Sequence, residues 1–166
     1  GISTTKEEVE RRQTVRETYL SFYKNSQEPN RICSLSDVQK QKVPLEDCQL
    51  VYAFFLGATP DGPTELVNPN STFPITVENA MIKEEDVVFL NIRENLEDGK
   101  SQTWFKYASM VAEEFPVDFI AKVDSDTLLF TPAFLDFAKR RLTRHKEYVY
   151  GGITMDKNSC DPTITE

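Results

Sequence analysis

The sequence predicts an α/β fold in which a mostly parallel sheet is flanked by helices. Short apolar runs alternate with longer segments whose apolar residues repeat at helical spacing, an order typical of successive βαβ units. The runs at 50–56, 86–92 and 117–123 have the length and apolar character of strands buried on both faces. With 166 residues, of which 39% are hydrophobic and 28% charged, the chain has the size and composition of one globular domain over residues 1–166.

Helices are predicted from start signals and from apolar residues that repeat on one face. The first helix opens on a Thr-x-x-Glu capping box, which fits the pair at 4 and 7 as well as the pair at 5 and 8. Thr131 and Pro132 suit the N-cap and the first residue of the last helix. The expected helices cover 4–24, 74–85, 100–115 and a segment from 131, and a fourth strand is expected at 148–150.

Residues 25–48 form a long connection, which predicts a functional or disulfide-tied loop. A disulfide between Cys33 and Cys48 would stabilise the fold by roughly 3 kcal/mol. Free thiols fit the sequence equally well, and the spacing of these two cysteines and Cys160 matches no zinc motif. The acceptor sequon at 70–72 and a disulfide would both favour a secretory compartment.

The charge balance and the missing motifs exclude several classes of function. A net charge of −8 argues against binding nucleic acid or an anionic membrane surface. The longest apolar run, at 50–56, is too short to span a bilayer. There is no P-loop, dinucleotide-binding or serine-hydrolase motif. The sequence starts at Gly1 rather than at a methionine and shows no secretory signal. We therefore expect a fragment, with any membrane anchor only in the full-length parent.

Two aspartates follow the predicted strand at 117–123. In a strand, residues two apart point to the same face, so Asp124 and Asp126 could converge on one ion. Carboxylate oxygens favour Mg²⁺ or Mn²⁺, and such a cation would neutralise charge on a departing diphosphate. The alternative is that these acids cap the turn into the next element, and the local sequence does not decide between the two.

Basic residues supply candidate contacts to a phosphate. Arg12 and Arg16 are four apart on the first predicted helix, so both could meet a phosphate, or pair with the acids of a solvated helix. Lys100 opens the third helix, where a cation is unfavourable unless it faces an anion. Lys122 lies within a strand and needs a partner such as Asp124.

Several segments resemble a glycosyltransferase family. Residues 12–19 resemble the opening Arg-x-x-Ile-Arg-x-Thr-Trp of the β-1,3-galactosyltransferase-like family, which includes fringe-type and N-acetylglucosaminyl members, with Tyr19 in place of Trp. Residues 122–126 resemble its Lys-x-Asp-Asp-Asp motif, with Ser125 in place of the middle acid. Further similar segments, in family order, are 51–57, 78–100 and 150–152.

The resemblance implies a GT-A fold, Rossmann-like and nucleotide-sugar-binding, with a UDP-sugar donor and Mn²⁺ or Mg²⁺. Asp126 would be the metal ligand, and Asp124 would contact the ribose or the metal through water. Arg12, Arg16 and Lys100 would bind the donor. The activity implied is an inverting, β-1,3-type hexosyltransferase acting on a glycan or glycoprotein acceptor.

The resemblance also sets what this chain is expected to lack. In the family the catalytic base lies downstream of the strand that corresponds to 148–152, so this fragment is expected to carry the donor site without the base. Family members lie in the Golgi membrane, on the lumenal side. The alternative function is a non-catalytic module of the same fold that binds a nucleotide-sugar or a glycan. The sugar, the acceptor and the oligomeric state are left open, because such specificity resides in loops.

Overall fold

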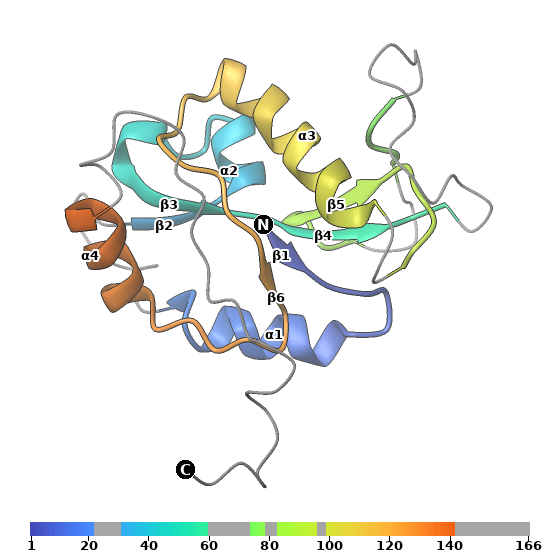
Figure 1. Ribbon diagram of the computed structural model, residues 1–166, viewed down its shortest axis with the longest axis horizontal. Coiled ribbons are helices and arrows are strands. Elements are labelled where there is room, and N and C mark those ends of the chain that lie inside the picture. Colours follow the sequence, from blue (N-terminus) through green and yellow to red (C-terminus); the bar gives the residue numbers. More distant parts are fainter. Residues whose placement is uncertain (22–30, 60–73, 79–82, 96–98, 142–166) are drawn as a thin grey trace, which may run out of the picture. The chain divides into compact units, whose positions relative to one another are not determined.

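The computed structural model describes residues 1–21, 31–59, 74–78, 83–95 and 99–141 (Figure 1). The chain divides into two compact units, Gly1–Thr131 and Pro132–Glu166, and the fold below is that of the first unit. A single domain over 1–166 therefore stays a prediction. In chain order the elements are β1 (Ile2–Ser3), α1 (Val9–Glu17), β2 (Arg31–Ser34), α2 (Leu35–Gln39), a 3-10 turn (Leu45–Asp47), β3 (Cys48–Tyr52), β4 (Phe54–Gly57), β5 (Val87–Leu90), α3 (Lys100–Glu114), β6 (Val123–Asp124) and α4 (Thr131–Arg141).

The main sheet has four strands in the order β5-β4-β1-β6, and all neighbours are parallel. Ile2 of β1 pairs with Phe54 on one side and with Val123 on the other, which places β1 between β4 and β6. A separate two-stranded parallel sheet joins β2 and β3. The predicted α/β class with a mostly parallel sheet is confirmed. Because the strands are parallel, the carboxyl ends of β5, β4, β1 and β6 lie at the same edge of the sheet.

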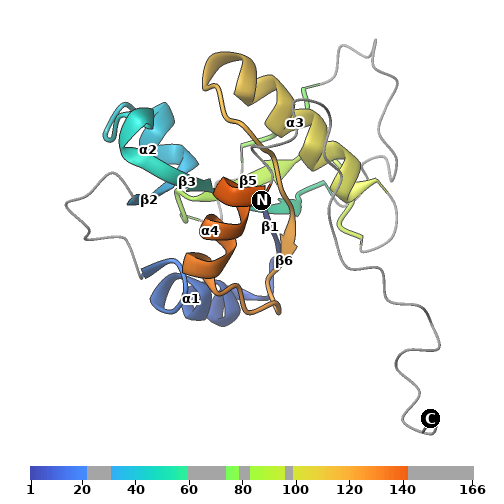
Figure 2. The same ribbon diagram turned by 60° about the vertical axis from the view of Figure 1, so that its left-hand side comes forward.

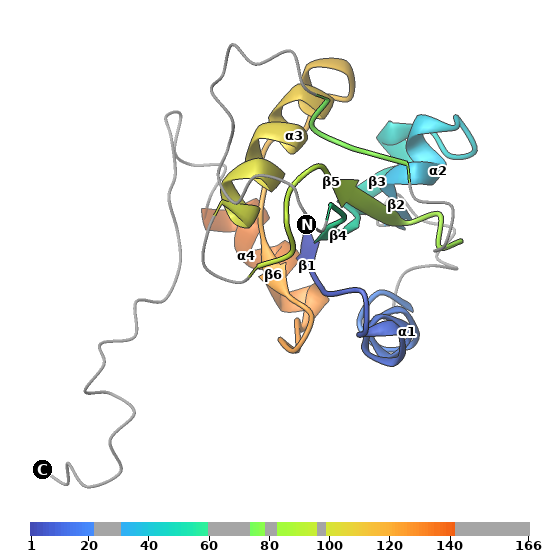
Figure 3. The same ribbon diagram turned by 90° about the vertical axis from the view of Figure 1, so that its right-hand side faces the viewer.

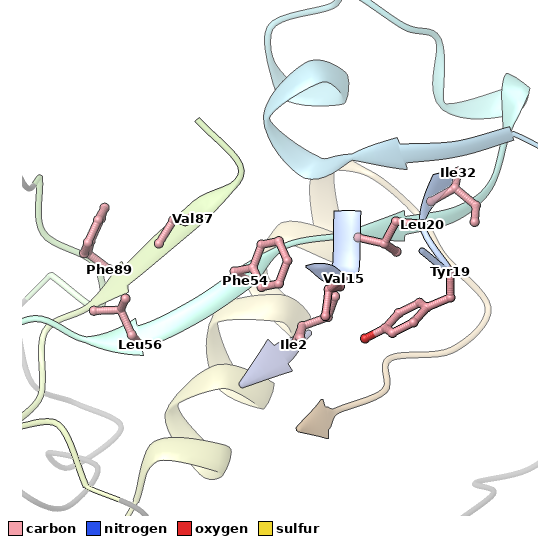
Figure 4. Packing of buried hydrophobic residues seen from close by; sticks show 9 residues of the cluster. All are labelled: Ile2, Val15, Tyr19, Leu20, Ile32, Phe54, Leu56, Val87 and Phe89. Carbon is pink, nitrogen blue, oxygen red and sulfur yellow. The ribbon is translucent and has the colours of Figure 1, made fainter. Parts of the chain in front are cut away.

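Helices cover both faces of the main sheet, because β4, one of its two inner strands, is apolar on both sides. Phe54 and Leu56 of β4 join a cluster with Val15 and Tyr19 of α1 (Figure 4). Phe55 faces the other way and stacks on Trp104 of α3, with ring centroids 4.7 Å apart. Figures 1 and 3 show α1 and α3 on opposite faces of the sheet. The continuous apolar run thus forms a doubly covered strand, as expected for a parallel sheet.

The predicted strand at 50–56 is wrong in one respect, because the structure divides it into β3 and β4, with Ala53 between them. Figure 2 shows β3 beside β2. Before this point the chain pairs with β2, and after it the chain pairs with β1 and β5. The Ala53 carbonyl already accepts a hydrogen bond from Ile2 N at 2.9 Å. Which strands pair is decided by the tertiary structure, so an apolar run alone does not reveal the change of partners.

Two other predicted elements have different bounds in the structure. The first helix begins at Val9 rather than at position 4, because Thr4 N still pairs with the Phe55 carbonyl at 3.1 Å and extends β1. Of the strand predicted at 117–123, only Val123 lies in β6, since its partner β1 has just two residues. The helix predicted at 100–115 is confirmed as α3, one residue shorter.

The segment predicted as a helix at 74–85 runs differently in its described part. Residues 74–78 lie along β5, where Val77 N donates to the Phe89 carbonyl at 2.9 Å and Asn91 N donates to the Ile75 carbonyl at 2.8 Å. These bonds satisfy the outer edge of β5, which leaves no helical bonds for the same backbone groups. The helix prediction is therefore wrong for 74–78.

Cys33 and Cys48 form a disulfide with a Cα–Cα distance of 5.8 Å, which resolves the alternative that the sequence left open. It joins β2 to the start of β3 and packs with Val38 and Val43. Cys160, the sequon at 70–72 and the predicted strand at 148–150 lie outside the described residues. Within the described part of the chain, no helix is both long and apolar enough to cross a bilayer.

Candidate donor and metal site

The candidate site lies where β1 and β6 end. Ser3 pairs with Asp124, so the residues that follow each strand, Thr4 and Ser125, start from neighbouring positions at the same edge of the sheet. Crevices outside the carboxyl ends of parallel strands are the usual ligand sites of open α/β sheets. The strand ends therefore bring the predicted acidic pair to the edge where a nucleotide would be expected.

Asp124 is the last residue of β6, and its side chain is 55% exposed. Its Oδ1 lies 2.6 Å from Lys122 Nζ, which confirms the prediction that Lys122 requires an acidic partner. Lys122 directly precedes β6, so the ion pair joins the residues on either side of Val123. A cation bound at Asp124 would compete with this lysine for the carboxylate.

Asp126 lies in a turn, so the expectation that both acids project from one strand is wrong. Residues 125 and 126 form this turn, and Thr127 N donates to the Asp124 carbonyl at 3.0 Å. The turn follows because β1 offers no partner beyond Ser3. Whether the two carboxylates meet at one ion therefore depends on the turn, not on strand periodicity.

The carboxylate oxygens of Asp124 and Asp126 fit a hard divalent cation. Both aspartate side chains are exposed at the sheet edge, and carboxylate oxygens are the ligands that Mg²⁺ and Mn²⁺ prefer. Among the described residues no group of three or more His, Cys, Asp or Glu could enclose a metal. One or two carboxylates completed by substrate phosphates and water are a common arrangement for such cations.

Ser125, between the two acids, is anchored to the start of α1. It is 7% exposed, and its hydroxyl donates to Glu8 Oε2 at 3.1 Å. The same oxygen accepts from Thr5 N at 2.9 Å and from Thr4 Oγ1 at 3.1 Å. The bond to Thr5 N resembles the Glu half of a capping box, but α1 begins at Val9 with Glu8 at its N-cap, so neither predicted Thr-x-x-Glu pair caps the helix.

The ionised form of Glu8 is favoured by these contacts. Burial alone raises the pKa of this carboxyl. The hydrogen bonds that it accepts, together with the charge of Arg11, outweigh burial and hold the pKa below its ordinary value of 4.5. Glu8 thus carries a negative charge at neutral pH next to residues 124–126, which we call the acidic turn.

Lys100 is buried at the same edge of the sheet, with 4% of its side chain exposed. Its Nζ donates to the Thr4 carbonyl at 2.7 Å and to Glu94 Oε1 at 2.5 Å. Glu94 also accepts from Gly57 N at 2.7 Å, at the end of β4. The anion that the helix start was expected to face is therefore Glu94, and a phosphate contact by Lys100 stays a prediction.

Arg12 and Arg16 pair with acids from a distant segment, not with the glutamates of their own helix. Arg12 is fully buried and donates to both oxygens of Glu84, at 2.6 and 3.0 Å. Arg16 donates to both oxygens of Asp86, at 2.7 and 2.9 Å, and also contacts Glu84. These bidentate pairs tie α1 to the chain before β5. Donor binding by either arginine stays a prediction.

The sequence-predicted residues are only partly brought together. The segment Thr4–Glu8 links three of the regions: it contacts Lys100 through the Thr4 carbonyl, Arg12 through the Thr5 carbonyl and the acidic turn through Ser125. Arg16 pairs instead with Asp86, at the start of β5. Sequence reasoning missed Glu8 and Glu94 as site residues, although the Thr-x-x-Glu pattern was a visible signal for Glu8.

A surface cavity of about 300 Å³ lies elsewhere in the first unit. It is lined by α2, β5, the segment before β5 and Tyr107 of α3, and none of the predicted site residues lines it. We give more weight to the sheet edge than to this cavity, because the acidic pair and its anchoring contacts lie there.

A mostly parallel sheet flanked by helices, with exposed aspartates after β6, is consistent with a glycosyltransferase domain of GT-A-like fold. The galactosyltransferase family model matches residues 10–163. The chain therefore belongs to the galactosyltransferase family, as the sequence motifs indicated. No curated protein and no solved structure matches it. Family membership implies a nucleotide-sugar donor and a glycan acceptor in general terms.

Proposed function

We propose that the chain carries the donor and metal site of an inverting, metal-dependent hexosyltransferase that moves a sugar from UDP to a glycan hydroxyl in β-1,3 linkage. The observation that carries the proposal is the position of Asp124 and Asp126, exposed after β6 at the carboxyl edge of the sheet. Their placement in a chain of the galactosyltransferase family supports transfer over other uses of an acidic pair.

In this proposal Asp126 holds Mn²⁺ or Mg²⁺ directly, and Asp124 contacts the ribose or reaches the metal through water. When bound, the cation neutralises negative charge on the departing diphosphate. Lys100 stabilises the site, since its Nζ donates hydrogen bonds to the Thr4 carbonyl, just after β1, and to Glu94. Arg12 and Arg16 hold α1 in place, which keeps the Thr4–Glu8 segment at the sheet edge.

The transfer itself is a displacement at the anomeric carbon. The acceptor oxygen forms a bond to that carbon as the bond to the UDP oxygen breaks, and the anomeric configuration inverts. The acceptor proton passes to a general base, which we assign to no described residue. UDP leaves with the bonding electron pair.

The Cys33–Cys48 disulfide supports a compartment of the secretory pathway, since disulfides persist in oxidising environments. We propose the lumenal side of the Golgi membrane, where glycans are assembled.

The decisive test of the proposal is Asp126→Asn. We expect Mn²⁺-dependent UDP affinity, measured by calorimetry, to fall more than about tenfold, because even outer-shell changes at metal sites cost 10- to 100-fold. The matched control is Asp118→Asn, an exposed acid that precedes β6 and should leave the affinity unchanged. Equal UDP affinity in Asp126→Asn and in the parent would contradict the proposal.

UDP release in the presence of acceptor glycans separates transfer from binding. Mn²⁺-dependent UDP binding without any release of UDP from UDP-sugars would favour the second candidate, a non-catalytic module that binds nucleotide-sugars.

A further inference from the structure

We propose that Glu8 is a positioning residue for the Asp124–Asp126 turn: it holds the Ser125 hydroxyl, and this contact raises the affinity of the chain for a divalent cation. The inference deepens the proposed function and rests on its metal site. Neither residue is itself assigned as a metal ligand.

Besides the Lys122–Asp124 ion pair, three hydrogen bonds among the described residues hold the acidic turn, and one of these three uses a side chain. At its start, Ser125 N donates to the Ser3 carbonyl at 2.9 Å, as part of the β1–β6 pairing. At its end, Thr127 N donates to the Asp124 carbonyl at 3.0 Å. Between them, the buried Ser125 hydroxyl donates to Glu8 Oε2 at 3.1 Å. The side-chain bond therefore ties the residue between the two aspartates to a different element.

Glu8 can hold the turn because its own carboxylate is fixed. Oε2 accepts from Thr5 N at 2.9 Å and from Thr4 Oγ1 at 3.1 Å, while Oε1 pairs with Arg11. Thr4 is 2% exposed and continues directly from the central strand β1. The acceptor of the Ser125 hydroxyl is thus anchored to the sheet itself rather than to a mobile side chain.

An anchored turn should bind a cation more tightly than an unanchored one. The two aspartates are exposed. Any part of the turn that is not already fixed must become ordered when a cation binds, and this loss of entropy lowers the binding affinity. A hydrogen bond to an ionised acceptor is stronger than a neutral one, so the Glu8 contact removes part of that cost beforehand.

The chemistry of position 125 fits this role. A carboxylate there would stand at hydrogen-bond distance from Oε2 of Glu8, where like charges repel. A serine supplies a donor without charge, so Ser125 and Glu8 are matched to each other. This gives a test that depends on the pair and not on either residue alone.

The first experiment measures Mn²⁺ affinity of the full chain without nucleotide, by the electron paramagnetic resonance signal of unbound Mn²⁺. We expect Ser125→Ala to weaken Mn²⁺ binding about tenfold, the effect of losing one hydrogen bond to a charged group. Ser125→Thr, which keeps the hydroxyl, should restore most of the affinity. Exchange of the Thr127 amide in the metal-free chain should be faster in Ser125→Ala than in the unsubstituted chain.

The second experiment separates contact from net charge. Glu8→Gln should weaken Mn²⁺ binding and speed Thr127 exchange, whereas Glu10→Gln, an exposed residue of α1 with the same loss of charge, should do neither. In a double-mutant cycle, Ser125→Asp should lower the melting temperature less in the Glu8→Gln background than in the parent, because contacting residues are not additive.

The outcomes of these experiments are distinct. Unchanged Mn²⁺ affinity and Thr127 exchange in Ser125→Ala, beside a loss of affinity in Asp126→Asn, would overturn the positioning role and leave the proposed function intact. Unchanged Mn²⁺ affinity in Asp126→Asn would instead overturn the metal site, and with it the functional part of this inference. Equal effects of Glu8→Gln and Glu10→Gln would also overturn it, since a contact would then be unnecessary.

Discussion

Individual residues at the sheet edge are held by close backbone approaches as well as by side chains. Gly57 ends β4 against the chain that follows β5, and its amide donates to Glu94 at 2.7 Å. A Cβ at this position would lie 2.6 Å from Glu94 N and 2.7 Å from Glu94 Cα, both backbone atoms that cannot move aside as a flexible side chain can. Glycine is thus required here by packing, and the same contact orients the carboxylate that holds Lys100.

Gly57→Ala is therefore expected to lower the free energy of unfolding by about 1–3 kcal/mol, the usual cost of an overpacked site. Urea denaturation measures the change. Ala58→Ser adds a single heavy atom at the next position and serves as the control. A Gly57→Ala variant as stable as the parent would show that the two segments can separate without cost.

At the scale of elements, α1 is attached to the sheet by charge pairs as well as by its apolar face. Arg12, which is fully buried, and Arg16 are held by Glu84 and Asp86, and the Arg16 guanidinium also lies 4.8 Å from the ring centroid of Phe54. Removal of one partner from such a cluster leaves the other charge without compensation in a partly buried place. This arrangement predicts that the arginines act chiefly on stability.

Arg12→Ala is expected to cost about 3–5 kcal/mol of unfolding free energy, the range for a broken buried pair. Arg16→Ala, whose side chain is more exposed, should cost less. A Mn²⁺-dependent UDP affinity equal to that of the unsubstituted chain, measured on folded variants, would show that the two arginines act through stability alone. A loss of UDP affinity in Arg16→Ala that exceeds its loss of stability would instead support the donor-binding role predicted from the sequence.

At the scale of the whole molecule, carboxyl groups whose pKa values fall on folding make stability depend on pH. The Arg12 hydrogen bonds, opposed by partial burial and aided by Arg16, hold the pKa of Glu84 below its ordinary value of 4.5. A carboxyl whose pKa is lower in the folded chain contributes stability above the unfolded pKa and loses it as the pH falls through the folded value. Glu8 shows the same direction.

We therefore expect the unfolding free energy to be steady near neutral pH and to decline below about pH 4.5, as Glu84 and Glu8 take up protons. Glu84→Gln should be less stable at pH 7 and should show a shallower decline in acid. Denaturation curves between pH 7 and pH 3 measure both effects, with Glu10→Gln as an exposed control. Parallel pH profiles for Glu84→Gln and the parent would contradict the assignment.

The sequence predicted best what depends on neighbours along the chain. The helical repeat at Trp104, Ala108 and Val111 located α3 to within one residue of its end. Continuous apolar runs identified the buried strands, although the break at Ala53 was invisible because both halves are equally apolar. At the site, Asp124 and Asp126 were recognised from their place after a strand, whereas a turn there was only one of two alternatives that the sequence left open.

What the sequence by itself determined is the parallel α/β class, the family and the acidic pair, since periodicity and motif spacing are local properties of the chain. Only the tertiary structure decided which polar groups meet: Arg12 with Glu84, 72 residues away, and Ser125 with Glu8, 117 residues away. The physical reason is that hydrogen bonds and ion pairs act over a few ångströms. Their partners are therefore fixed by which strand ends come together in the sheet, and no local pattern records that.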